Sequence, residues 1–107
     1  MSMVVPGAMV GSGGEINGWV SVLAQRLTIS SELSSPCPAF RASATFQCND
    51  PYTVPGSYTI SQGSELGTDT IRITLRSNDG RSLHINGELE ESVSQVYQLS
   101  GRITLVG

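Results

Sequence analysis

His84 is the single histidine of the chain and the first residue whose chemistry would suit catalysis. A catalytic histidine needs a serine or cysteine within hydrogen-bond reach and an orienting acid behind it. Serines are abundant, but none lies in a Gly-x-Ser-x-Gly elbow. His84 alternates with Leu83 and Ile85, which places it on the polar face of a strand. We interpret it as a solvated strand histidine and predict that the protein is not an enzyme.

Three carboxylates, Glu88, Glu90 and Glu91, cluster at the end of the same apolar run. Paired carboxylates can hydrolyse glycosides when a cleft holds them at a suitable separation. Hard cations also bind such groups, but the chain has no Asp-x-Asp-x-Asp loop. We interpret the cluster as a charged rim that keeps a sheet edge soluble. The sequence therefore predicts no metal and no cofactor.

Cys37 and Cys48 are the only cysteines. An even count in a small β-rich chain is consistent with a disulfide formed in an oxidising compartment. Closing this loop would stabilise the fold by roughly 2–3 kcal/mol. The alternative is a pair of buried free thiols in a cytosolic protein. Zinc is not expected, because two cysteines and one distant histidine cannot complete a tetrahedral site.

Aromatic side chains are the best candidates for a binding platform. A surface that stacks sugar or peptide groups would need several of them on one face. Trp19 is favoured because it points away from the aliphatic face of its own strand, although core packing explains it equally well. The set that we single out is Trp19, Tyr52 and Tyr58.

Arginines supply every positive side chain of the chain. Arg72, Arg76 and Arg102 are expected to point outward, where they form a strip for an acidic partner or pair with neighbouring carboxylates for little gain. The formal net charge is −3 and charged residues make up 14% of the sequence. A nucleic-acid-binding domain normally carries a basic field. We therefore predict no nucleic-acid partner.

The stretch 70–105 gives the clearest prediction of the strands that position these side chains. Its apolar residues fall on odd positions, and polar residues stand between them. This is the pattern of a sheet with one buried face and one solvent-exposed face. Three strands forming an antiparallel meander are predicted here. The apolar residues are Ile71, Ile73, Leu75, Leu83, Ile85, Leu89, Tyr97, Leu99, Ile103 and Leu105.

The first hairpin of this meander has a definite register. The sequence at 78–80, Asn-Asp-Gly, suits a type I turn followed by a left-handed glycine. Setting Ser77 opposite Arg81 predicts apolar pairs between Leu75 and Leu83, Ile73 and Ile85, and Ile71 and Gly87. On the other face, Thr74 meets His84, Arg72 meets Asn86 and Thr70 meets Glu88. The third strand is expected beside the second, with Ile85 against Leu99.

Shorter strands are predicted at 15–23, 26–33, 40–48 and 58–60. Residues 1–14 contain a Gly-Ser-Gly-Gly run and are expected to form a flexible tether, followed by a single β-domain over 15–107. The chain has 107 residues, a usual size for one domain. About seven short strands predict an all-β fold, a small antiparallel β-sandwich or alternatively a small β-barrel.

These features favour a non-enzymatic, extracytoplasmic binding protein with a protein partner. One example is the soluble part of a small bacterial envelope lipoprotein that serves secretion or outer-membrane assembly. Any lipid anchor and signal would then precede Met1, and no other membrane contact is expected. A carbohydrate-binding or adhesin module that uses Trp19 is one alternative. A secreted protease inhibitor or effector that presents the loop at 49–56 or 62–69 is another.

Overall fold

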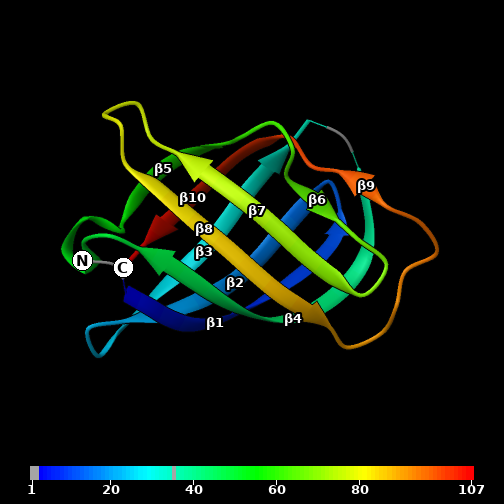
Figure 1. Ribbon diagram of the computed structural model, residues 1–107, viewed down its shortest axis with the longest axis horizontal. Coiled ribbons are helices and arrows are strands. Elements are labelled where there is room, and N and C mark those ends of the chain that lie inside the picture. Colours follow the sequence, from blue (N-terminus) through cyan, green and yellow to red (C-terminus); the bar gives the residue numbers. More distant parts are fainter. Residues whose placement is uncertain (1–2, 35) are drawn as a thin grey trace.

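The computed structural model describes residues 3–34 and 36–107, and these form ten strands (Figure 1). The one helical element in these residues is the 3-10 turn η1, Pro51–Thr53. Within this described part, no helix is long and apolar enough to cross a membrane. The strands are β1 Met3–Gly13, β2 Glu15–Val22, β3 Gln25–Leu33, β4 Cys37–Cys48, β5 Gly56–Ile60, β6 Glu65–Leu66, β7 Thr70–Arg76, β8 Ser82–Leu89, β9 Tyr97–Gln98 and β10 Gly101–Val106.

Eight of the strands close into an antiparallel barrel. Around the wall they follow the order β5, β10, β3, β2, β1, β4, β8 and β7, and a short β5–β7 ladder completes the circle by pairing Thr59 with Arg76 and Ile60 with Leu75. The two-residue strands β6 and β9 extend the sheet beside the other half of β7. The all-β prediction is confirmed, and the barrel describes the fold better than the sandwich does.

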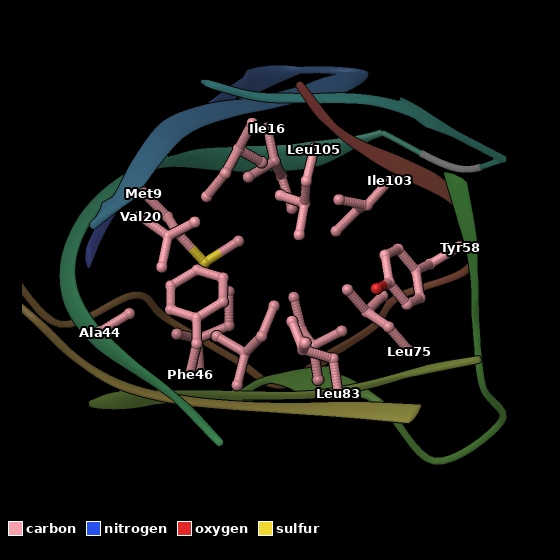
Figure 2. Packing of buried hydrophobic residues seen from close by; sticks show 14 of the residues in the cluster. Met9, Ile16, Val20, Ala44, Phe46, Tyr58, Leu75, Leu83, Ile103 and Leu105 are labelled. Carbon is pink, nitrogen blue, oxygen red and sulfur yellow. The ribbon is translucent and has the colours of Figure 1, made fainter. Parts of the chain in front are cut away.

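The core fills the inside of this barrel. Side chains from strands all round the wall point inward and meet one another, as Figure 2 shows for Met9, Phe46, Tyr58, Leu75 and Leu105 among others. Because each strand alternates, the same strands direct the intervening residues outward. A small barrel of this kind is a packed core and leaves no sheet edge open along the closed part of the wall.

The 70–89 hairpin is confirmed in every predicted pair, including Leu75 with Leu83, Ile73 with Ile85, and Thr74 with His84. Gly80 has a φ of 90°, as its place after the turn requires.

The predicted position of the third strand of the meander is wrong. The other side of β8 is taken by β4, where Phe46 pairs with Ile85. Strand β10 lies between β3 and β5 instead, with Leu105 opposite Ile29. The segment that follows β8 first runs to β9, which pairs with β6.

The predicted N-terminal tether is also wrong. Residues Met3–Gly13 form β1, a wall strand that pairs with β2 on one side and β4 on the other. Val5 and Met9 are buried in the core. Gly13, with a φ of 65°, ends β1 directly before the turn into β2. The glycines of this segment therefore serve a tight wall and a turn.

Small residues at inward positions let the strands curl into a barrel. One row runs across the wall from Val20 through Gly7, Ala44 and Gly87 to Ile71, each opposite the next. A Cβ on Gly7 would lie 2.7 Å from the Phe46 ring, so that ring occupies the space a side chain would need. Glycines in such places mark a close approach or a sharp bend of the sheet.

The predicted disulfide is absent, because Cys37 and Cys48 are free thiols at opposite ends of β4. A strand rises about 3.3 Å per residue, so the 12-residue length of β4 separates its ends by roughly 35 Å along the strand. A disulfide requires Cα atoms within about 7 Å of each other. Both thiols are buried, and this burial raises the pKa of each. The alternative of two buried free thiols is the correct one.

Candidate binding surface

The outward-facing side chains of the barrel are polar on almost every strand. The exposed sides of β3, β4, β7 and β8 carry arginine, serine, threonine, asparagine, glutamine, glutamate and His84. Within the described residues, β1 is the one wall strand whose successive outward positions are apolar. The composition of the outer wall therefore distinguishes this strand from the others.

The apolar positions of β1 are its even-numbered residues. Val4 is 61% exposed and Val10 is 39% exposed, while Pro6 is exposed and Ala8 is half-buried. The odd residues between them point into the core, so the alternation of the strand forces these four outward. Contiguous exposed apolar groups on a soluble domain mark interaction sites more often than scattered ones do.

Trp19 on β2 continues the apolar surface sideways, because it lies directly opposite Ala8. It is half-buried, and the Arg26 guanidinium lies 4.4 Å from the centroid of its ring. Stacking of this kind combines a cation–π attraction with an exposed charged fork. Val4, Pro6, Ala8, Val10 and Trp19 together are called the β1 surface below.

A groove of about 380 Å³ lies at the Val10 end of the β1 surface. Its apolar lining includes Val10, Phe40 and Val93, and its rim carries Arg41, Glu90 and Glu91.

Backbone hydrogen bonds fix the wall of this groove. The Glu90 N–H donates to the Arg41 carbonyl at 2.8 Å, and the Val93 N–H donates to the Thr68 carbonyl at 2.9 Å. The Ser92 hydroxyl also donates to the Asp69 carboxylate. The groove is therefore built by two strands and one anchored connection.

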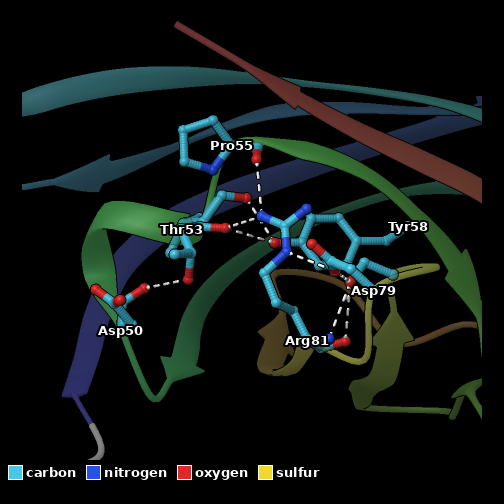
Figure 3. Close-up of polar contacts among 8 residues, drawn as sticks. Asp50, Thr53, Pro55, Tyr58, Asp79 and Arg81 are labelled. Atoms are coloured by element: carbon cyan, nitrogen blue, oxygen red, sulfur yellow. Dashed lines mark hydrogen bonds and ion pairs between the residues drawn. The ribbon is translucent and has the colours of Figure 1, made fainter.

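A polar cluster around Arg81 covers the barrel end that holds the 49–56 loop (Figure 3). The Arg81 guanidinium donates to the carbonyls of Thr53 and Pro55 and lies 5.5 Å from the centroid of the Tyr58 ring. Its Nε donates to Asp79 at 2.9 Å. The Tyr58 hydroxyl donates to the Val54 carbonyl at 2.7 Å.

Electrostatics in this cluster follow from those contacts. A hydrogen bond from the Ser77 hydroxyl, and next to it the Arg81 side chain, lowers the pKa of Asp79 to about 2. Burial raises the pKa of Tyr58. A depression of about 350 Å³ lies beside the cluster. Within the cluster, Arg81 donates hydrogen bonds to carbonyls of the 49–56 loop. The cluster therefore fastens a loop to the barrel.

The structure does not bring the predicted binding residues into one site. Trp19 lies on the outer wall, whereas Tyr52 is 80% exposed in η1 at a barrel end. Tyr58 is 1% exposed and packs in the core, so its prediction as a partner-binding residue is wrong.

Arg72 and Arg76 are exposed on β7. Three strands separate β7 from β2 in either direction around the wall: β8, β4 and β1 on one side, and β5, β10 and β3 on the other. These arginines therefore lie across the barrel from Trp19.

The residues considered for catalysis are also apart. His84 faces outward as its register predicted, and its Nδ1 lies 3.3 Å from the Thr74 hydroxyl. Its cross-strand neighbours are Thr74 and Gln47, neither of which is an acid. Glu90 and Glu91 line the groove on the β1 surface. Among the described residues, no three His, Cys, Asp or Glu side chains gather as a metal site.

Sequence reasoning missed both the β1 surface and the role of Arg81. In β1, apolar residues occupy outward positions such as Val4 and Ala8 as well as inward ones such as Val5 and Met9, so no alternation is visible. The signal for Arg81 was its place directly after the turn at 78–80, which aims it at the neighbouring loop.

Comparison with protein-family models, with curated proteins and with solved structures finds no match to this chain.

Proposed function

We propose that this protein is a non-enzymatic binding module that engages another protein through the β1 surface. The observation that carries the proposal is the apolar outer face of β1 on a barrel whose other strands carry mostly polar residues outside. Covering an exposed valine side chain completely is worth about 1.5–3 kcal/mol. Val4 and Val10 would gain much of that energy from a partner, because both are well exposed.

The residues around the β1 surface are of types that are common in protein interfaces. Tryptophan and arginine are enriched among residues that dominate binding energy, and Trp19 with Arg26 supplies both beside Ala8. The charged rim at Arg41, Glu90 and Glu91 would add specificity at the edge of the contact. A partner with a complementary apolar patch and charged border is therefore favoured.

Carbohydrate binding has less support. An aromatic platform would need several accessible rings, but Tyr58 is buried and Arg26 stacks on Trp19.

A protease inhibitor or effector is the second candidate, because the 49–56 loop is held rigidly. Arg81 fixes the carbonyls of Thr53 and Pro55, while Tyr52 projects into solvent. A loop held in one conformation loses little entropy on binding. Stoichiometric inhibition of a protease, lost in Tyr52→Ala, would favour this candidate over the first.

The predicted disulfide was one argument for an extracytoplasmic location of the protein. Because the thiols are free, one reason for an extracytoplasmic compartment is gone. An envelope location with a lipid anchor upstream of Met1 stays a prediction from the sequence. The binding role that we propose does not depend on the compartment.

Site-specific photo-crosslinking in the native host tests the proposal. A photoreactive residue placed at position 4 or 10 should capture one defined protein, and the same residue at position 59, on β5, should not. The purified partner should then bind the barrel, with affinity at least tenfold weaker for the double variant Val4→Ser and Val10→Ser. The control Val106→Ser removes an outward valine, 49% exposed, from β10. Equal affinity for all variants would contradict the proposal.

A further inference from the structure

Strand β4 is longer than the ladder that covers one of its sides. It begins at Cys37, but its pairing with β8 begins only at Ala42. Beyond that pair, the Glu90 N–H donates to the Arg41 carbonyl, and the chain then leaves for Thr68 and β9. In the described residues, the stretch 37–40 has a strand partner on the β1 side alone. A strand edge without a partner presents backbone donors and acceptors to any extended chain.

The groove on the β1 surface runs beside this open edge. Ala39, Phe40 and Arg41 line it from β4, and Glu90 to Val93 line it from the connection that follows β8. The space that an added strand would enter is therefore already shaped. Val10, Val93 and Phe40, which line the groove, would receive one apolar side chain of that strand.

Charge at the groove selects the remaining side chains. The groove is lined by two carboxylates, Glu90 and Glu91, and by one guanidinium, that of Arg41, so its rim carries an excess of negative charge. An extended strand alternates its side chains between two faces. A segment in which apolar and basic residues alternate would place one kind in the groove and the other near the rim.

A second short open edge, at the start of β1, is less suitable. The ladder between β1 and β2 begins at Gly7, which leaves 3–6 of β1 paired with β4 alone. Pro6 stands where that ladder stops, and proline has no N–H to donate to an added strand. The β4 edge contains Pro38, so there the donors must come from its other residues. The groove lined by Ala39, Phe40 and Arg41 is the feature that favours the β4 edge.

We infer that the partner presents an extended segment of alternating apolar and basic residues, which adds as a strand to the β4 edge at 37–40. Main-chain hydrogen bonds to β4 supply affinity, and the groove with Glu90 and Glu91 supplies specificity. This inference rests on the proposed function and names the chemistry of the segment that the binding surface takes.

Titration of the full, isotope-labelled chain with synthetic peptides tests the inference by NMR. The probe is a capped eight-residue peptide that alternates valine and lysine. Its controls are a valine–glutamate peptide and a valine–lysine peptide with alternate backbone nitrogens methylated. We expect saturable amide shifts confined to 10–12, 39–41 and 90–93, with at least tenfold weaker binding of both controls. Equal binding of the three peptides, or shifts spread over the whole barrel, would overturn strand addition.

Variants separate the groove from the rest of the binding surface. Changing both carboxylates, Glu90→Gln with Glu91→Gln, should weaken the valine–lysine peptide about threefold to tenfold, since two exposed charge contacts are lost. The matched control Glu32→Gln changes an exposed carboxylate of β3 that does not line the groove, and it should leave binding unchanged. Val10→Ser provides a second test through the apolar lining.

The two proposals fail differently. If the peptides do not bind at the groove but crosslinking from positions 4 and 10 still captures a partner, strand addition is wrong and the β1 surface remains. If neither the peptides nor a partner engage this side of the barrel, both proposals are wrong.

Discussion

Arg81 shows how one residue can hold a loop against a barrel. Its side chain is 30% exposed, yet it donates to two loop carbonyls and to Asp79 and lies over the Tyr58 ring. Lysine would provide a charge there but not a planar fork that reaches several acceptors at once. The loop at 49–56 therefore depends on a single side chain from the neighbouring hairpin.

Replacing Arg81 with alanine should destabilise the protein by about 1–2 kcal/mol, because hydrogen bonds to a charged group are lost at a partly solvated position. The measurement is the free energy of unfolding from urea denaturation. Arg76→Ala removes an exposed arginine of β7 and should change that energy by less than about 0.5 kcal/mol. Equal effects of the two variants would show that Arg81 does not fasten the loop.

Asp79 gives the same cluster a dependence on pH. Its pKa is lowered to about 2, first by the Ser77 hydroxyl and then by Arg81, compared with about 3.9 in an unfolded chain. A depressed carboxyl pKa stabilises the fold above the unfolded value, and that contribution is lost as pH falls through about 2. An NMR titration of the carboxyl carbon should therefore give a midpoint near 2, and Ser77→Ala should raise it. A midpoint near 4 in the unmodified protein would refute this assignment.

At the scale of the elements, glycine decides where the strands bend. Gly18 points inward on β2, and a Cβ there would collide with the Ala8 carbonyl of β1. Because the clash is with backbone, no side-chain rotation could relieve it. The close approach of β1 and β2 therefore requires glycine at this position.

Gly18→Ala should cost about 3 kcal/mol or more, since the backbone would have to shift within a packed wall. Thermal or urea unfolding measures the loss. Gly14→Ala is the matched control, because a Cβ on Gly14 has nothing within 4 Å, and it should change stability by less than about 0.5 kcal/mol. A stable Gly18→Ala variant would mean that the two strands are not so close.

Alternation of side chains predicted the strands well and their neighbours poorly. The hairpin of β7 and β8 was predictable because Asn-Asp-Gly at 78–80 fixes a register that the apolar pairs then confirm. A period of two says which face is buried, but it does not say which strand lies alongside. The position of β10 between β3 and β5 is a long-range choice that the local pattern does not contain.

Cys37 and Cys48 illustrate the same limit. Their even count favoured a disulfide, and only the unbroken course of β4 shows that they cannot meet. The binding surface was hidden for a related reason, because apolar residues on both faces of β1, such as Val4 outside and Val5 inside, erase the contrast that reveals a strand.

At the scale of the whole molecule, closure of the barrel depends on β1. This strand joins β2 to β4 and brings Val5 and Met9 into the core. Without it, both neighbours would become long open edges of an incomplete sheet. The N-terminal segment is therefore part of the folding unit.

Removal of residues 1–13 should abolish cooperative folding, because the wall would be open and the core would lose buried side chains. Circular dichroism and calorimetry would show no sharp transition, and aggregation is expected. Removal of Gly107 alone is the control and should leave the transition in place. A fragment 14–107 that unfolds at the temperature of the full chain would contradict the closed barrel.

The most direct measurement of the central claim is solvent paramagnetic relaxation at the methyl groups of β1, with a soluble gadolinium complex as the probe. If β1 is a wall strand with an apolar outer face, the methyls of Val4 and Val10 are strongly broadened, and those of Val5 and Met9 are protected. Uniform broadening of the methyl signals of all four residues would indicate that this segment is a free tether. Uniform protection would mean that no apolar surface is offered to a partner.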